Sequence, residues 1–272
     1  MAGLLAGLTL PGLAQALRPW LAELIALLLF VSALRIGPKA AIGRMQDVRS
    51  TLAFALTYQL AAPLAALALL SLAGLADTTA GLIAVLILAA PPVTGAPNFT
   101  IMMNRDPAPP MRLLLVGTAI FPLTVIPVML ALPAIPTLGG VLIGALRLML
   151  VIGLAVGLAF AIRRGKDLSD PHRVALDGVA ALLLAVVVIG LMSAVNPTLK
   201  NAPATLAAWL GFAMALNFGL QLLAHRLLPG TDRAGLSIAA GNRNIALFLV
   251  ALPEDIVAQI LIFIGCYQVP MY

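Results

Sequence analysis

A single arginine with polar neighbours lies inside an otherwise apolar stretch of this chain. The stretch Ala234–Leu252 reads AGLSIAAGNRNIALFLVAL, and its polar centre consists of Gly241, Asn242, Arg243 and Asn244. A charge placed deep in a membrane costs roughly 2.5–3.5 kcal/mol on insertion scales, so such a residue usually faces a cavity or a partner. A guanidinium there can bind a carboxylate or phosphate through paired hydrogen bonds, or it can cap backbone carbonyls. The glycine and the two asparagines weaken a helix, so we expect the helix to be interrupted here.

A second apolar stretch, Gly81–Met103, also carries the signs of an interruption. Its sequence GLIAVLILAAPPVTGAPNFTIMM contains three prolines, which remove backbone donors and clash with the preceding helical turn. Thr94, Asn98 and Thr100 supply side-chain oxygens, and a helix that starts near Pro97 would direct its positive end at the break. Interrupted helices are tolerated at mid-membrane only where the freed backbone lines a cavity or is buried in protein. The polar residues of both stretches therefore either bind a solute or satisfy that backbone.

Four polar residues of other apolar segments are further candidates for such a site. Tyr58 and Gln59 are adjacent in one segment, Asn217 lies in a later one, and Gln268 lies near the end. Each of them either lines the site or makes a hydrogen bond between helices. Ser, His and Asp form no catalytic constellation, and no glycine loop for phosphate is present, so we expect neither an enzyme nor a cofactor. Cys266 is the one cysteine, which excludes an internal disulfide.

The composition is that of a multi-pass membrane protein. Of the 272 residues, 62% are hydrophobic and 10% are charged, whereas a soluble domain has about 25% charged residues. The mean hydropathy is +1.10. The formal net charge of +6 comes from basic residues in short loops between apolar runs, which favours anchoring of those loops over nucleic-acid binding. The expected partners are the lipid bilayer and a small solute.

Charge clusters and Pro, Gly or Asn turns divide the chain into ten apolar segments, most of them near the length that crosses a membrane as a helix and the first of them short. The predicted fold is therefore an all-α polytopic membrane protein with ten transmembrane helices. The tenth segment reaches Tyr272 without a polar flank, which indicates a chain that is clipped at its C-terminus. The segments are Ala2–Leu17, Leu21–Leu34, Thr51–Leu72, Ala80–Met103, Met111–Leu132, Gly139–Ile162, Val174–Val195, Ala204–Leu227, Ala234–Leu252 and Ile256–Tyr272.

The basic residues of the loops alternate between the two sides of this predicted topology. Twelve lie in every second loop, and two, Arg18 and Lys200, lie in the loops of the opposite side. The positive-inside rule then predicts that both termini are cytoplasmic, and we expect the protein in a bacterial inner membrane. The twelve are Arg35, Lys39, Arg44, Arg49, Arg105, Arg112, Arg163, Arg164, Lys166, Arg173, Arg226 and Arg233.

Each half of the chain contains one interrupted segment, the fourth and the ninth of the ten. Five helices in each half give the two halves opposite topologies. The predicted organisation is two inverted repeats, residues 1–132 and 139–272, whose broken helices 4 and 9 enter from opposite sides and cross. A pair of interrupted segments at corresponding positions of two halves is the best sequence indication of a transporter binding site near the bilayer midplane.

These residues resemble the bile acid:sodium symporter family. The run Asn217-Phe-Gly followed by Ser237–Asn244, SIAAGNRN, is similar to the eighth and ninth helices of that family, and Pro91–Asn98, PPVTGAPN, is similar to the crossover in its fourth helix. The resemblance covers nearly the whole chain in segment order. It implies a panel domain of helices 1, 2, 6 and 7, a core domain of helices 3–5 and 8–10, and alternating access. It also implies transport of organic anions, such as steroid acids or small carboxylates, driven by Na⁺.

The sodium ligands that the resemblance implies for the ninth helix are incomplete. Gly241 and Asn244 match the family pattern, but Ala239 stands where the family has its sodium-binding Glu, and Arg243 stands where it has Gln. We hypothesise that the Arg243 guanidinium takes the place of the missing cation, holds the crossover together and attracts an anion. Na⁺ coupling is therefore doubted, and a uniporter, an exchanger or H⁺ coupling would remain.

The fourth and fifth helices show the same loss. Asn98 matches the family pattern, whereas Pro97 replaces a serine, and the hydroxyl positions early in the fifth helix fall near Met111 and Leu115. The sequence thus predicts a degenerate sodium site around Ala239 and Asn98 and no firm metal site. The readings weighed against an uncoupled anion transporter are an ordinary Na⁺-coupled symporter, a metalloid-anion exporter of the same superfamily and a membrane sensor or scaffold that moves no solute. The exporter is disfavoured because the fourth-helix break contains no cysteine.

Overall fold

The regular structure of the chain is helical throughout its described part. The structure, a computed structural model, describes residues 2–43, 48–135, 137–164, 167–230 and 232–271. Arg44, Lys166 and Tyr272, which entered the predictions above, lie outside these ranges. Within these ranges, seven helical stretches are long and apolar enough to cross a membrane. The prediction of a helical multi-pass membrane protein is therefore confirmed at this level.

The seven long stretches coincide with predicted segments to within a few residues, except near the N-terminus. There, α2 (Pro11–Leu17), the 3₁₀ turn η1 (Arg18–Trp20) and the larger part of α3 (Leu21–Gly43) form the stretch Pro11–Pro38, and α1 (Ala2–Thr9) is separate. The others contain α4 (Val48–Leu56), the π-helical turn η2 (Thr57–Ala61) and α5 (Ala62–Leu72); α8 (Ala108–Ala131); α9 (Leu138–Ile162); α10 (Asp170–Leu191) with α11 (Val195–Asn201); α12 (Pro203–Leu227); and α15 (Glu254–Met271).

The two stretches predicted to be broken are composed of short helices. α6 (Thr79–Ala89) and α7 (Ala96–Met102) replace a single fourth helix. In the second stretch, α13 (Arg233–Gly241) is followed by the non-helical residues 242–244 and then by the 3₁₀ turn η3 (Ile245–Leu247) and α14 (Phe248–Ala251). Both interruptions expected from the proline and Gly-Asn runs are therefore present.

The chain forms two compact units, each assembled from segments far apart in the sequence. Unit 1 comprises Met1–Gly43, Met149–Ala213 and Leu261–Tyr272, and unit 2 comprises Arg44–Leu148 and Met214–Ile260. Neither unit equals one half of the chain, so each contains parts of both predicted repeats.

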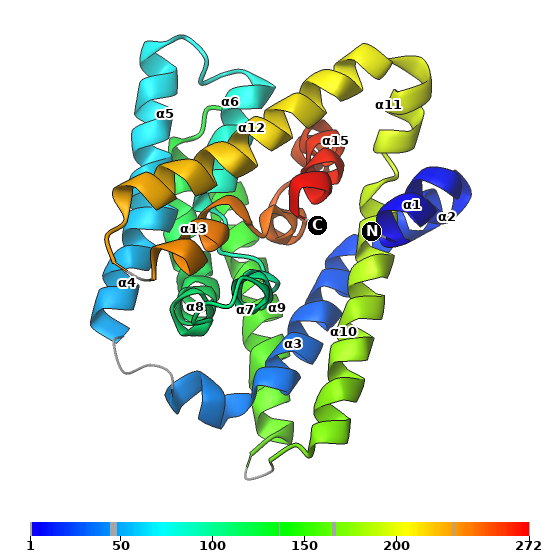
Figure 1. The fold of residues 1–272 in the computed structure, drawn as a ribbon. Helices are drawn as coiled ribbons and strands as arrows, with labels where there is room; N and C mark the ends of the chain where they lie inside the picture. Colours follow the sequence, from blue (N-terminus) through cyan, green and yellow to red (C-terminus); the bar gives the residue numbers. More distant parts are fainter. Residues whose placement is uncertain (1, 44–47, 136, 165–166, 231, 272) are drawn as a thin grey trace. The chain divides into compact units, whose positions relative to one another are not determined.

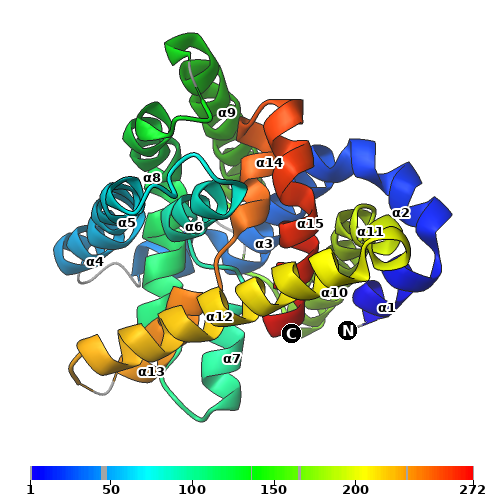
Figure 2. The ribbon, with the colours of Figure 1, turned by 90° about the horizontal axis from the view of Figure 1, so that it is seen from above.

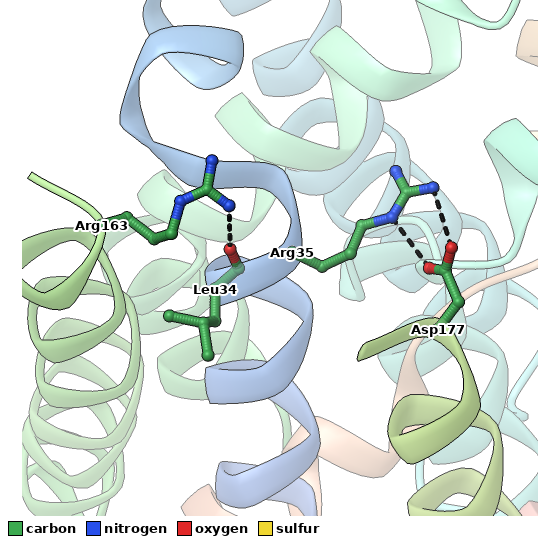
Figure 3. Close-up of polar contacts among 4 residues, drawn as sticks. All are labelled: Leu34, Arg35, Arg163 and Asp177. Carbon is green, nitrogen blue, oxygen red and sulfur yellow. Dashed lines mark hydrogen bonds and ion pairs between the residues drawn. The ribbon is translucent and has the colours of Figure 1, made fainter. Parts of the chain in front are cut away.

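In unit 1, α10 packs along α3 and α1 (Figure 1). α3 is interrupted at Gly37, whose φ of 72° favours glycine, and Pro38 follows. Beside this break, the Arg163 guanidinium donates to the Leu34 carbonyl at 2.9 Å, and Arg35 forms a two-point ion pair with Asp177 at 2.8 and 3.2 Å (Figure 3). These contacts join α3 to the end of α9 and to α10.

Two further interruptions in unit 1 are closed by amide side chains. The chain is not helical at Leu10, between α1 and α2, and it makes a turn between α10 and α11 at Met192–Ala194. Asn196 donates to the Leu8 carbonyl at 2.5 Å, and Gln15 donates to the Ser193 carbonyl at 2.8 Å. Each break thus supplies a donor to the other, which satisfies carbonyls that the helices leave without a partner.

Unit 2 contains all the elements that carry the predicted crossing. α4 packs on α8, α5 on α6, and α7 on α13 (Figures 1 and 2). Pro63 has no backbone N–H, which explains why the helix widens into the π-helical turn η2 immediately before it. Such turns insert one extra residue and occur frequently at functional sites. Here the turn contains Tyr58 and Gln59.

Candidate functional site

The breaks of the two interrupted segments of unit 2 meet and pair as a short antiparallel bridge. We call this place, formed by residues 90–95 and 242–244, the crossing. Ala90 adopts an extended conformation, as expected for a residue before proline, and this ends α6. The bridge joins Pro92 to Arg243. The Val93 N–H donates to the Asn242 carbonyl at 2.9 Å, and the Asn244 N–H donates to the Pro91 carbonyl at 2.8 Å. Each break therefore satisfies backbone groups of the other, as irregular backbone within a membrane requires.

The Arg243 side chain joins the C-terminal ends of the two half-helices. Its Nε donates to the Ala240 carbonyl at 2.9 Å, in the last turn of α13, and its Nη1 donates to the Ala90 carbonyl at 2.8 Å, at the end of α6. Helix C-termini carry partial negative charge, so a cation between two of them is favourably placed. Only 1% of the residue's surface is exposed. Of the two roles that the sequence left open, capping of carbonyls is the one this geometry displays.

An aromatic ring covers one face of the guanidinium. Arg243 Cζ lies 3.9 Å from the centre of the Tyr58 ring, well within the range of a cation–π interaction. Tyr58 is itself stacked on Phe54, with ring centres 5.1 Å apart. The π-helical turn in which Tyr58 lies changes the helical register there by one residue, so this turn determines which side chain faces the crossing.

A chain of amides extends from the crossing to α12. The buried Asn217 donates through Nδ2 to the Gly241 carbonyl at 2.7 Å and to Asn242 Oδ1 at 3.2 Å. Gln221 donates to Asn217 Oδ1 at 2.6 Å, and Asn242 Nδ2 donates to the Ile238 carbonyl at 3.0 Å. A Cβ on Gly241 would collide with the Asn217 carbonyl and the Gln221 side chain, so glycine permits this close approach.

The position of the implied sodium carboxylate is apolar. Ala239 is fully buried and belongs to a cluster that includes Ala55, Ala96, Leu113 and Val116. Side chains of this kind supply no oxygen ligands, which Na⁺ requires. The Thr100 hydroxyl, also buried, donates to the Ala96 carbonyl of its own helix at 2.9 Å. Hydrophobic packing thus occupies the place where the resemblance implies a cation ligand.

The remaining predicted site residues differ in their burial and in the hydrogen bonds that they make. Asn98 is exposed and Thr94 is half-buried. Gln59 is buried and donates to the Gly117 carbonyl of α8 at 3.2 Å, while its Oε1 is buried without a hydrogen-bond partner. Gln268 belongs to unit 1, where it donates to the Ile264 carbonyl of its own helix at 3.0 Å. The structure brings together Arg243, Asn242, Asn244, Gly241, Asn217 and Tyr58.

Two parts of the arrangement were missed by the sequence reasoning. Gln221 lies one helical turn after Asn217, and that spacing of two amides in an apolar helix is a signal that would have identified it. The carbonyls of Ala90 and Ala240 give no sequence signal, because which carbonyls a cation meets is decided by the crossing. Within the described ranges no three His, Cys, Asp or Glu side chains gather as a metal site would require.

Fold and site together define a multi-pass helical membrane protein with two broken helices that cross at a buried arginine. The sequence was compared with models of protein families and with curated proteins, and no match was found in either comparison. The resemblance to the bile acid:sodium symporter family therefore depends on the residues quoted in the sequence analysis.

Proposed function

We propose that the protein is a secondary transporter of an organic anion that works by alternating access and does not depend on Na⁺. The observation that carries this proposal is the bridge between Pro92 and Arg243 in the middle of two interrupted helices. Discontinuous helices that meet in this way form the substrate and ion sites of many secondary transporters. The proposal includes ten transmembrane helices in two inverted repeats, cytoplasmic termini and a bacterial inner membrane location.

The charge of the crossing supports an anion as the solute. The residues of both breaks, 90–95 and 242–244, include one charged side chain, Arg243, and no carboxylate. The guanidinium is buried and holds carbonyls, so it would act on a solute mainly through its field. An isolated unit charge would attract an anion about 6 Å away by roughly 3 kcal/mol at an effective dielectric constant of about 20, and the partial negative charges of the two helix ends reduce this gain. A cationic solute would be disfavoured by the same amount.

The composition of the two units supports movement of one body against another. Unit 1 contains the first, second and seventh predicted segments and the greater part of the sixth, which the resemblance places in a panel domain, together with most of the tenth, which it places in the core. Unit 2 contains the third, fourth, fifth and ninth, which it places in a core domain. Units built from corresponding parts of both halves of a chain are what alternating access by rigid-body motion needs.

An ordinary Na⁺-coupled symporter is the nearest alternative, and two observations count against it. Ala239 is packed among apolar side chains, and Asn98 is exposed. Both residues lie where the resemblance implies a sodium site. A Na⁺ ion at this place would lack the carboxylate that offsets its desolvation.

Flux measurements in liposomes test the proposal. The purified protein is reconstituted, and uptake of labelled small carboxylates and steroid acids is measured with external Na⁺ or with external K⁺. We expect uptake of at least one anion above that of protein-free liposomes and at the same rate in both salts. Uptake that requires Na⁺ would establish the ordinary symporter. Anion binding without any flux would instead establish a sensor or scaffold. Arg243→Gln is expected to abolish this uptake, and Arg147→Gln, at an exposed arginine of α9, is the matched control.

A further inference from the structure

The crossing has the form of a cation site built from backbone carbonyls. The Ala90 and Ala240 carbonyls come from two different half-helices, and both point at one guanidinium at 2.8 and 2.9 Å. Each helix C-terminus carries about half a negative elementary charge, so the two ends together nearly balance one monovalent cation. Unwound carbonyls and half-helix C-termini are the groups with which interrupted helices coordinate monovalent cations.

The surroundings of the guanidinium fit the same interpretation. The Tyr58 ring lies over it at 3.9 Å, and an aromatic face attracts a cation whether the cation is a free ion or a side chain. Water has little access, because Arg243 is 1% exposed. A buried charge of this kind is retained only where its environment stabilises the charged form. The environment here includes carbonyl oxygens and an aromatic face.

We propose that the crossing is a monovalent-cation site that is permanently occupied by the Arg243 guanidinium, so that removal of this side chain opens a site for a free cation. The inference deepens the proposed function, on which it rests for the expectation that transport is independent of Na⁺. The first cation expected to enter the opened site is guanidinium, because it reproduces the planar donors of the side chain. Na⁺ is expected to bind more weakly, because Ala239 supplies no carboxylate.

Rescue of an arginine-deleted variant tests the site directly. Arg243→Ala is purified in detergent, and its midpoint of thermal unfolding (Tm) is measured in choline chloride and in mixtures that contain millimolar guanidinium chloride, well below denaturing concentrations. We expect a loss of roughly 10 °C in Tm relative to the unmodified protein. Guanidinium should restore at least half of that loss with a saturable dependence on concentration, since a ligand that binds only the folded state stabilises it by mass action.

The matched control is Arg163→Ala, which removes the second buried arginine of the described chain. Arg163 donates to the Leu34 carbonyl of α3 at 2.9 Å, beside the Gly37 break, and it follows the last residue of the candidate membrane span α9. We expect its Tm to be insensitive to guanidinium. The proposal is overturned if Arg243→Ala keeps the Tm of the unmodified protein, or if guanidinium restores neither variant, or restores both equally.

A second measurement keeps the proposal testable should Arg243→Ala fail to fold. The unmodified protein is titrated with Na⁺ against K⁺ and choline at constant ionic strength. An occupied site predicts identical Tm values in the three salts, and a shift specific to Na⁺ overturns the proposal. Different outcomes refute the transport proposal and the cation-site proposal. Guanidinium rescue without anion flux in liposomes would refute transport alone, and a Na⁺-specific shift together with flux would refute the resident cation alone.

Discussion

Two arginines are buried in the described part of the chain, and both donate to carbonyls at interrupted helices. Arg163 lies in unit 1, immediately after α9, and donates to one α3 carbonyl beside Gly37. Arg243 lies in unit 2 and donates to the carbonyls of two half-helices. Arg163 follows the last residue of a candidate membrane span, whereas Arg243 has long apolar sequence on both sides.

The difference shows that burial of an arginine does not by itself indicate function. Near the end of a span a guanidinium can reach the interface, and an exposed ion pair between Arg35 and Asp177 lies beside it. At the crossing, the charge is balanced by helix ends and by the Tyr58 ring. We therefore interpret Arg163 as a cap of one helix and Arg243 as the cation of a site.

Among the conservative substitutions considered, Arg243→Lys is expected to lower Tm the most. Its comparison with Arg163→Lys distinguishes a cation site from a helix cap. Arg243→Lys keeps the charge but replaces a planar fork by a single ammonium, which cannot meet both carbonyls in the same geometry. A lost hydrogen bond to a charged group costs about 1.5–3 kcal/mol, so we expect Tm to fall by roughly 4–10 °C. Arg163→Lys should lose less than half as much, because Arg163 follows the last residue of a candidate membrane span, where a charge can reach the interface. Equal losses in thermal unfolding would remove the distinction between cap and site.

The interruptions that this comparison depends on could be predicted from the sequence. Pro91 and Pro92 remove donors that α6 would need, and the Gly241-Asn242 pair weakens α13 at its end. Arg243 was identified because a charge far from any loop is costly. Residue types alone thus located the break and the cation, and the seven long helices follow from apolar length.

The partners of these residues could not be predicted, for a physical reason. The sequence places Arg163 at the end of a segment, as one of the loop residues expected in the cytoplasm. It is buried beside Gly37, where a Cβ would lie 2.7 Å from a terminal nitrogen of the guanidinium, so the glycine leaves room for this side chain. The burial of Ala239 likewise depends on α4 and α8, which are distant in sequence. Contacts of this kind are decided by tertiary packing.

Substitution of Tyr58 is expected to lower Tm by an intermediate amount. The Tyr58 ring covers the guanidinium of Arg243, so this substitution tests whether the aromatic face is part of the cation site. Tyr58→Leu removes the ring over Arg243, and a cation–π interaction is worth about 0.5–2 kcal/mol depending on desolvation. Tyr58→Phe keeps the ring and should retain most of this stability. Thermal unfolding of the two variants, each in the Arg243 and the Arg243→Ala background, forms a double-mutant cycle. A coupling energy near zero would show that the ring does not stabilise the guanidinium.

The smallest effect is expected at Asp177, because its ion pair with Arg35 is solvent-accessible on both sides. The two side chains are 53% and 42% exposed, and exposed ion pairs contribute about 0–1 kcal/mol. Asp177→Asn should therefore change Tm by less than about 4 °C, and added salt should reduce the difference further. A loss as large as that of Arg243→Lys would mean that charge, and not carbonyl capping, holds the α3 end of unit 1. Arg163 would then lie in an electrostatic cluster of its own, and the contrast with Arg243 would have to be drawn from membrane depth alone.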